Sequence, residues 1–239
     1  MFFITGNGRS GTVFLADLLG KSNNGHVFHE YPSLDMRGFV DAYLGQKELT
    51  PMRLKIIEVR QTQQPDLVYG EVNSYLRYQI PFLRTMTSQI FHLVRNGKDV
   101  IRSMMNRNPL SFTDEDDKET REIFPYGDDP YIERWPNMDR FERLCWFWQH
   151  TILELCKEKV PIIQFEQMLA SYDYLQQKLL NFIGVELDFE VWNYERRILK
   201  NETPRHNRKF PKYLDWSNKQ KESFERICSK SMEIIGYVI

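Results

Sequence analysis

The sequence predicts an α/β fold in which a central parallel sheet of about five strands is flanked by helices. Three observations carry this prediction. Short apolar runs alternate with segments of helical periodicity, the runs are apolar on both faces, and a glycine-rich loop joins the first run to the first helix. With 239 residues, 41% of them hydrophobic, the chain is long enough to bury a sizeable core. We therefore expect a single domain over residues 1–239.

Strands are expected where the apolar runs are bounded by turn residues. These runs are Phe2 to Thr5, His26 to Phe28, Leu67 to Gly70, Gln89 to Val94 and Val160 to Phe165. Because the runs are almost wholly apolar, both faces of each strand must be covered. This pattern is typical of a parallel sheet between two layers of helices.

Helical periodicity fills the segments between and after these strands. The predicted helices are Thr12 to Lys21, Ser74 to Met86, Lys98 to Met105, Met138 to Lys159, Glu166 to Ile183 and Ser217 to Ile235. Ser217 is a typical N-cap residue for the last of them. The segment Asn108 to Asn137 is rich in Pro, Asp and Glu and is predicted to be a long loop or lid.

The glycine-rich loop after the first strand, Gly6-Asn-Gly-Arg-Ser-Gly-Thr12, is predicted to bind an anion. A strand, a glycine loop and a helix N-terminus in this order bring backbone N–H groups together where the helix dipole favours negative charge. Gly8 and Gly11 allow close approach of the backbone, and Ser10 and Thr12 add hydroxyl donors. A glycine turn that binds no ligand is the structural alternative.

The same loop fits two other phosphate-binding motifs. As G-x-G-x-x-G with Glu30 about 20 residues later, it matches a dinucleotide fingerprint and implies a nicotinamide or flavin oxidoreductase. As a nucleoside triphosphatase loop it is incomplete, because Thr12 and Val13 stand where Lys and Ser/Thr belong. Arg9 inside the loop suits a ligand whose phosphate charge changes during a reaction. A protein that binds a nucleotide without catalysis is a third alternative.

A second candidate phosphate site lies at the end of the fourth predicted strand. Arg95 stands at the C-terminal edge of that strand, where open α/β sheets bind ligands, and Ser103 follows eight residues later. An Arg and a Ser so placed are suited to hold a phosphate, the Arg through its planar donor fork. A surface ion pair is the alternative for Arg95.

Together, Arg9-Ser-Gly-Thr12 and the pair Arg95 and Ser103 resemble the sulfotransferases that use 3′-phosphoadenosine 5′-phosphosulfate (PAPS). The resemblance implies a P-loop-like first loop, in which Gly8 to Thr12 bind the 5′-phosphosulfate, and a 3′-phosphate held by Arg95 and Ser103. Phe14 falls where members of the family often carry an aromatic residue that stacks on adenine. A core position in the first helix is the alternative for Phe14.

Segments near the C-terminus extend the resemblance. Arg205 to Trp216 is similar to the basic loop that closes over the 3′-phosphate in this family. Its basic residues are Arg205, Arg208, Lys209 and Lys212, and the choice among them is open. We take Arg208 and Lys209 as the candidates, with a solvated basic turn as the alternative.

The resemblance implies transfer of a sulfuryl group from PAPS to a hydroxyl or amine acceptor, without a metal. Arg9 would stabilise charge on the departing phosphate. Glu30 lies 21 residues after Arg9, roughly where family members with a carboxylate base carry a Glu, and is the candidate base. Glu71 is the second candidate, and a structural ion pair is the alternative role for Glu30. His29 and His92 are predicted to be structural.

Composition narrows the partners and the compartment. The 32 basic and 33 acidic residues leave a formal charge of −1, which argues against nucleic acid as a partner. The resemblance implies a small-molecule or glycan acceptor. The 3 cysteines lack metal-ligand spacing and are expected to be reduced thiols. No apolar run is long enough to span a bilayer, so we expect no membrane partner and a cytoplasmic protein.

Overall fold

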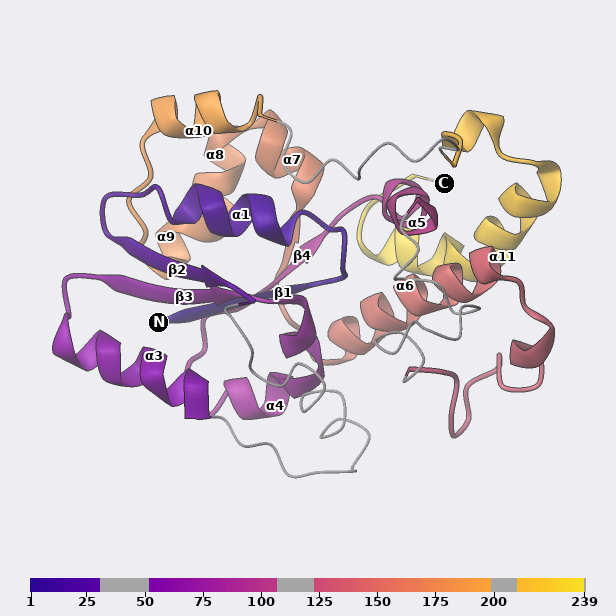
Figure 1. Cartoon of the computed structure of the whole chain (residues 1–239), viewed down its shortest axis with the longest axis horizontal. Helices are drawn as coiled ribbons and strands as arrows, with labels where there is room; N and C mark the ends of the chain where they lie inside the picture. The colour runs from indigo at the N-terminus through magenta and orange to yellow at the C-terminus, as the bar shows by residue number, and fades with distance from the viewer. Residues whose placement is uncertain (31–51, 107–122, 199–209, 239) are drawn as a thin grey trace. The chain divides into compact units, whose positions relative to one another are not determined.

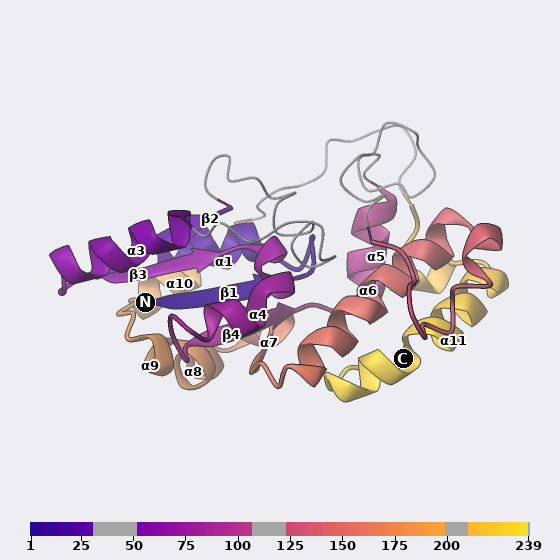
Figure 2. The same ribbon diagram turned by 90° about the horizontal axis from the view of Figure 1, so that it is seen from below.

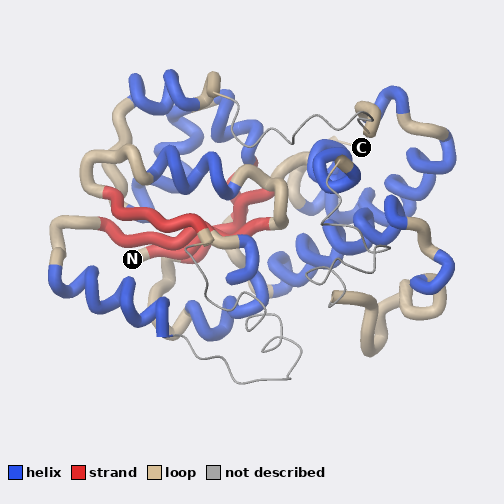
Figure 3. The backbone as a smooth tube through the Cα atoms, viewed as in Figure 1, coloured by secondary structure: helices blue, strands red, loops and turns tan. Residues whose placement is uncertain are grey.

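The computed structural model describes residues 1–30, 52–106, 123–198 and 210–238. The chain divides into two compact units, the first made of residues 1–95 and 158–202 and the second of residues 96–157 and 203–239. Among the described residues, all strands belong to the first unit, and the second contains helices and loops (Figure 3).

A parallel sheet forms the centre of the first unit and confirms the predicted fold class. Its strands are β1 (Phe2–Gly6), β2 (Gly25–His29), β3 (Val68–Val72), β4 (Ile90–Val94) and β5 (Ile162–Gln164). The strand order is β2-β3-β1-β4-β5, and every pairing is parallel. Each predicted strand overlaps one of these. Since β1 lies in the middle, the loop that follows it opens at the centre of the carboxyl edge.

Helices cover both faces of this sheet (Figure 1). One face carries α1 (Thr12–Leu19), α7 (Phe165–Ala170), α8 (Tyr172–Leu175), the π-helical turn η4 (Gln176–Leu180), α9 (Asn181–Ile183) and α10 (Phe189–Glu195). The other face carries α3 (Met52–Gln63), the 3₁₀ helix η1 (Ser74–Gln79) and α4 (Ile80–Leu83). This double cover explains why β1 and β4 are buried at every residue.

The core between the sheet and α1 anchors the anion loop. Phe2 and Ile4 of β1 pack there with Leu15 and Leu18 of α1, and all four side chains are fully buried. Burying an aliphatic or aromatic side chain of this size contributes about 1.5–3 kcal/mol. The loop is therefore anchored on both sides, by the strand before it and by the helix after it.

Two predicted helices are interrupted. The helix expected from Ser74 to Met86 is instead η1 followed by α4, because Pro81 in the first turn of α4 has no N–H to continue the bonding pattern. The helix expected from Glu166 to Ile183 breaks at Ser171, whose backbone is extended. The Ser171 hydroxyl accepts a hydrogen bond from the Tyr174 amide at 3.1 Å and caps α8.

The described part of the second unit contains three α-helices. They are α5 (Gly97–Met105), α6 (Arg140–Lys157) and α11 (Asn218–Ile234), with the short 3₁₀ turns η3 (Trp135–Asn137) and η5 (Tyr213–Asp215). Helices α6 and α11 run side by side (Figures 1 and 2). A Cβ on Gly97 would lie 3.0 Å from the Trp148 indole, so glycine allows α5 to approach α6 closely.

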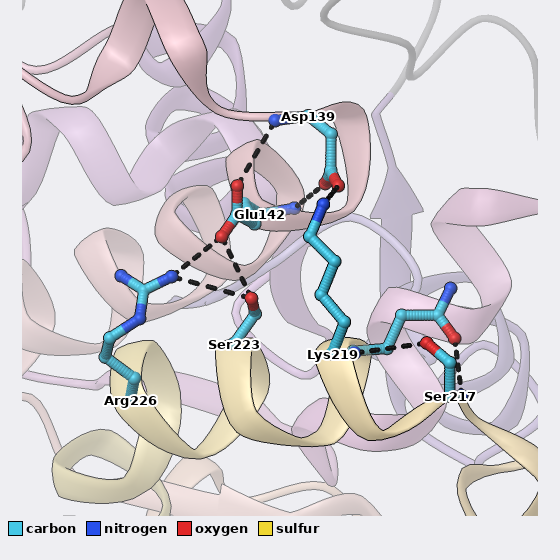
Figure 4. A network of polar contacts seen from close by, with 7 residues as sticks. Asp139, Glu142, Ser217, Lys219, Ser223 and Arg226 are labelled. Carbon is cyan, nitrogen blue, oxygen red and sulfur yellow. Dashed lines mark hydrogen bonds and ion pairs between the residues drawn. The ribbon is translucent and has the colours of Figure 1, made fainter.

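Matching caps start α6 and α11 (Figure 4). The Glu142 amide donates to Asp139 Oδ1 at 3.0 Å, and the Asp139 amide donates to Glu142 Oε2 at 3.3 Å. Ser217 forms the equivalent capping box for α11, which confirms it as the predicted N-cap. Ion pairs from Lys219 to Asp139, at 3.1 Å, and from Arg226 to Glu142, at 2.7 Å, join the two helices.

The predicted lid, Asn108 to Asn137, is described only in its second part. Residues 123–137 form turns and end in η3, whereas residues 108–122 lie outside the described residues. The lid therefore stays a prediction. In the described part of the chain, no helix is both long enough and apolar enough to cross a membrane.

Candidate functional site

The candidate site lies in the first unit, along the edge where the parallel strands end. The loop of residues 7–11 follows β1, His29 ends β2 with Glu30 directly after it, and Asn73 and Ser74 follow β3. Arg95 follows β4. Parallel strands share one carboxyl edge, and this is where open α/β sheets bind ligands. The loop, Glu30 and Arg95 are thus brought to the same edge.

The loop has a backbone suited to an anion. Arg9 and Gly11 have φ angles of +73° and +97°, in the left-handed region. An arginine rarely adopts that region, at a cost of about 1–3 kcal/mol. Alternating left- and right-handed residues turn successive N–H groups toward one point and form an anion-binding concavity. The helix α1 begins at Thr12 and adds its N-terminal dipole.

The glycines of the loop have different roles. A Cβ on Gly11 would lie 2.3 Å from the Phe165 ring, and one on Gly6 would lie 3.0 Å from the Leu93 carbonyl oxygen. The fold itself therefore requires glycine at these two positions. A Cβ on Gly8 would meet no described atom within 4 Å. Gly8 is therefore the glycine that the fold of the described residues does not require.

Ser10 holds a buried hydroxyl inside the loop. The residue is 1% exposed, and its Oγ has no hydrogen-bond partner among the described residues. The Ser10 amide donates to the Asn7 carbonyl oxygen at 3.1 Å, which fixes the turn. A buried polar group left without a partner costs about 1–3 kcal/mol. The Ser10 hydroxyl is thus a buried donor whose hydrogen-bonding capacity is unused among the described residues.

Phe14 lies in the core. It is 6% exposed, and its ring packs edge-on against Phe165 with the ring centroids 6.0 Å apart. This burial favours the packing role of Phe14 over adenine stacking.

Glu30 is held by the end of β3. Its Oε1 accepts a hydrogen bond from the Ser74 hydroxyl at 2.6 Å and one from the Ser74 amide at 3.3 Å. Its backbone has a φ of +37°, in the left-handed region, and its amide donates to the Val72 carbonyl oxygen at 3.3 Å. The Glu30 carboxylate is therefore anchored through one oxygen. The left-handed backbone of Glu30 turns the chain after β2.

Glu71, the second candidate base, is poorly placed to reach an acceptor. Its residue is 1% exposed, and its Oε1 accepts a hydrogen bond from Asn73 Nδ2 at 3.0 Å. Asn73 Oδ1 in turn accepts from the Tyr75 amide at 2.9 Å and caps η1. Glu71 thus belongs to a buried network that supports the end of β3.

His29 contacts the anion loop directly. Its Nε2 lies 3.2 Å from Thr12 Oγ1, at the first residue of α1. Burial lowers the pKa of His29, and the negative charges of Glu30 and Asp17 partly oppose this. Thr12 and His29 are 17 residues apart, and nothing in the sequence indicates that they are in contact.

Arg95 lies against the loop. Its Nη1 donates to the Arg9 carbonyl oxygen at 3.3 Å, and its guanidinium lies over the Phe165 ring, 5.2 Å from the centroid. Its Nε is buried and has no hydrogen-bond partner among the described residues. Phe165, the first residue of α7, thus touches both the loop and Arg95, a role that sequence inspection did not indicate.

The remaining predicted residues lie elsewhere in the chain. Ser103 belongs to α5 in the second unit, and its pairing with Arg95 stays a prediction. Arg208 and Lys209 lie outside the described residues.

No metal-ligand cluster is described beside these residues, and the two described cavities lie elsewhere in the chain. Within residues 1–30, 52–106, 123–198 and 210–238, no group of three or more His, Cys, Asp or Glu is placed to hold a metal ion. A cavity of about 420 Å³ in the first unit is lined by Asn23 and by residues of the segment from Tyr172 to Asp188. Another of about 560 Å³ lies in the second unit beside Trp146. Neither lining includes a residue of the loop, Glu30 or Arg95.

Comparison with known proteins supports the fold. No protein-family model matches the chain, and no curated protein matches it. Among solved structures, the chain is similar to a sulfotransferase from Alicyclobacillus acidocaldarius. The two are 14% identical, with a TM-score of 0.50 over 100% of this chain and 96% of the other. At this identity the likeness concerns architecture, so the chain shares the α/β fold of a solved sulfotransferase.

Proposed function

We propose that the protein transfers a sulfuryl group from PAPS to a hydroxyl or amine of a small-molecule or glycan acceptor. The observation that carries the proposal is the buried Ser10 hydroxyl without a partner, inside a loop whose Arg9 has a left-handed backbone. A phosphate oxygen would accept the hydrogen bond that Ser10 lacks. The fold likeness to a sulfotransferase then favours sulfuryl transfer among reactions of phosphate-bearing donors.

In this proposal the loop holds the leaving group. The acceptor oxygen or nitrogen forms a bond to sulfur while the bond from sulfur to the bridging oxygen of PAPS breaks. The electron pair stays on the 5′-phosphate, which departs as part of adenosine 3′,5′-bisphosphate. Arg9, Ser10 and Thr12 would stabilise this charge as it develops. A sulfuryl group carries less charge than a phosphoryl group, so the proposal invokes no metal.

Glu30 would take the proton of the acceptor. Ser74 fixes Oε1, so Oε2 is the oxygen that would accept the proton. A base anchored in this way loses little conformational freedom when the acceptor arrives. The burial of Glu71 gives a second reason to assign the role to Glu30.

Arg95 would bind the 3′-phosphate from its place beside the loop. Its hydrogen bond to the Arg9 carbonyl oxygen and its position over the Phe165 ring hold the guanidinium plane in one orientation. A planar fork so held can bind two phosphate oxygens. Ser103, Arg208 and Lys209 complete this site in the proposal, on the strength of the family resemblance alone.

The strand order argues against the nicotinamide alternative. In the Rossmann order the second strand neighbours the first, and its terminal acid reaches the ribose. Here β3 separates β2 from β1, so Glu30 ends a strand about 10 Å from β1. Its carboxylate is instead engaged by Ser74.

The experiment compares two nucleotides on one variant. Arg95→Ala should weaken binding of adenosine 3′,5′-bisphosphate at least about tenfold more than binding of adenosine 5′-monophosphate, because only the former has a 3′-phosphate. Arg84→Ala is the matched control, since Arg84 in the same unit is paired with Glu158 at 2.6 Å. If affinity for the two nucleotides falls equally, Arg95 does not bind the 3′-phosphate and instead stabilises the loop through Arg9.

A further inference from the structure

The hydrogen bond between His29 and Thr12 links the end of β2 to the anion loop. Thr12 is 6% exposed, and its methyl group packs close to Gly6, so its side chain is held in place. Helix α1 packs against β2, which is why a residue of β2 reaches the first turn of α1 although β3 separates β2 from β1. The contact of 3.2 Å is therefore part of the loop's architecture.

The direction of this hydrogen bond decides what Thr12 offers to an anion. A threonine hydroxyl has a single proton. If Thr12 donates to His29 Nε2, its oxygen lone pairs are left to face the phosphate, which is repulsive. If His29 Nε2–H donates instead, the Thr12 proton is free to bind a phosphate oxygen. An anion in the loop therefore selects the His29 form that carries a proton on Nε2.

The same geometry couples His29 to the charge of the ligand. Burial lowers the pKa of His29, so the ring is neutral at pH 7 in the ligand-free protein. A phosphate on the other side of Thr12 favours the imidazolium, which adds a proton at Nδ1 and keeps the proton on Nε2.

Two charges near His29, among the described residues, act in the same direction before and after binding. They are Glu30 at the end of the same strand and Asp17 on α1, and both raise the pKa. On β3 the nearest acid is Glu71, which pairs with Phe28 and so points to the opposite face of the sheet from His29. The new charge is therefore the ligand's, and its sign predicts proton uptake.

We propose that His29 is a positioning residue that donates from Nε2 to Thr12, directs the Thr12 hydroxyl to the bound phosphate, and takes up a proton from solvent when that phosphate binds. This inference rests on the proposed function, since it requires a phosphate in the loop. Below the pKa that His29 has in the ligand-free protein, its ring is protonated with or without ligand. Above the pKa that it has in the complex, the ring is neutral in both. Affinity thus rises as pH falls between these two values.

The test is calorimetric titration of the full chain with adenosine 3′,5′-bisphosphate at pH 6.5, in two buffers of different ionisation enthalpy. His29→Gln retains an N–H donor near the position of Nε2 but cannot titrate. We expect the wild type to take up more protons per ligand than His29→Gln, by up to about one. Subtracting the variant removes the titration of the ligand's own phosphates, whose pKa lies near 6.

A second variant tests positioning. His29→Leu, which has no donor, should bind the bisphosphate about tenfold more weakly than His29→Gln at pH 8, the factor for one ordinary hydrogen bond. His26→Gln is the matched control, because exposed His26 lies on the same strand without touching Thr12, and it should behave as wild type. Nitrogen NMR of bound His29 should show protonated Nε2.

The outcomes separate the two proposals. Equal proton uptake by the wild type and His29→Gln, or a bound His29 with a bare Nε2, overturns the role of His29 while leaving phosphate binding in place. A folded wild type that gives no heat with the bisphosphate overturns the proposed function. If His29→Leu fails to fold, the proton count of His29→Gln decides alone.

Discussion

The Ser74 hydroxyl donates to Glu30 Oε1 at 2.6 Å and ties the ends of β2 and β3 together. The backbone amide of Ser74 adds a second hydrogen bond at 3.3 Å. This pair gives Glu30 a fixed orientation at the carboxyl edge of the sheet. The proposed role of Glu30 as the base therefore has a testable dependence on Ser74.

Glu30→Gln should keep binding of adenosine 3′,5′-bisphosphate and lose turnover by about 10²- to 10⁴-fold, because the amide cannot accept the acceptor's proton. Ser74→Ala should lower turnover less, by about tenfold, because the Ser74 amide still holds the carboxylate. Transfer from labelled PAPS, measured beside bisphosphate affinity, separates the two effects. Near-normal turnover in Glu30→Gln would assign the base elsewhere.

Ser10→Ala should stabilise the ligand-free protein and weaken ligand binding. Removing a buried hydroxyl that has no partner recovers about 1 kcal/mol of unfolding free energy, whereas a bound phosphate loses one hydrogen bond. Denaturant unfolding and bisphosphate titration measure these two effects.

Ser231→Ala supplies the matched control. Ser231 is fully buried in α11, and its Oγ also has no partner among the described residues. This variant should gain similar stability and bind the bisphosphate as wild type does. If Ser10→Ala binds the bisphosphate as tightly as the wild type, the Ser10 hydroxyl is not a ligand donor.

Gly8 and Gly11 should respond differently to alanine. Gly11→Ala places a Cβ 2.3 Å from Phe165 at a φ of +97°, and should lose at least about 1–3 kcal/mol of unfolding free energy. Gly8→Ala meets no described atom within 4 Å, so its stability should change by less than about 0.5 kcal/mol. Its bisphosphate affinity should nevertheless fall, because the added methyl group occupies the approach to the loop. Unchanged affinity in Gly8→Ala would contradict a ligand at that point.

The strands and the first helix could be predicted from the sequence because their signals are local. Apolar runs in β1 and β4 and the helical periodicity of α1 are properties of neighbouring residues. The break at Pro81 was also a local signal, since a proline restricts helix bonding wherever it occurs. Helix α10 is harder to predict, because its seven residues hold a helical period for barely two turns.

The anion loop could be predicted from the sequence, but the contacts that hold the residues of the site in place could not. Strand order is a long-range property, so neither the contact of His29 with Thr12 nor that of Glu30 with Ser74 follows from spacing in the chain. Phe165 is distant in sequence from Gly11 and Arg95, yet it packs against both. Such contacts become visible only when the strands are placed side by side.

His92 should make the protein sensitive to acid. Complete burial, aided by the positive charge of Arg77, lowers its pKa to about 3, and Thr5 Oγ1 lies 3.1 Å from its Nδ1. The unfolded chain protonates at a higher pH than the folded one. Stability is therefore complete above about pH 6.5 and falls by about 1.4 kcal/mol per pH unit below it, down to the folded pKa.

His92→Gln cannot titrate and should show a shallower loss of stability than the wild type. Between pH 6.5 and 5 the difference should be about 2 kcal/mol, measured by denaturant unfolding at each pH. His26→Gln, at an exposed position, should retain the slope of the wild type. Parallel slopes for the wild type and His92→Gln would refute the assignment.

The most direct test of phosphate recognition is calorimetric titration of the wild type with adenosine 3′,5′-bisphosphate and, separately, with NAD. The proposed function predicts saturable 1:1 binding of the bisphosphate that Ser10→Ala weakens about tenfold, and much weaker binding of NAD. Binding of NAD with no heat from the bisphosphate would contradict the assignment of the loop and the sulfuryl-transfer proposal with it.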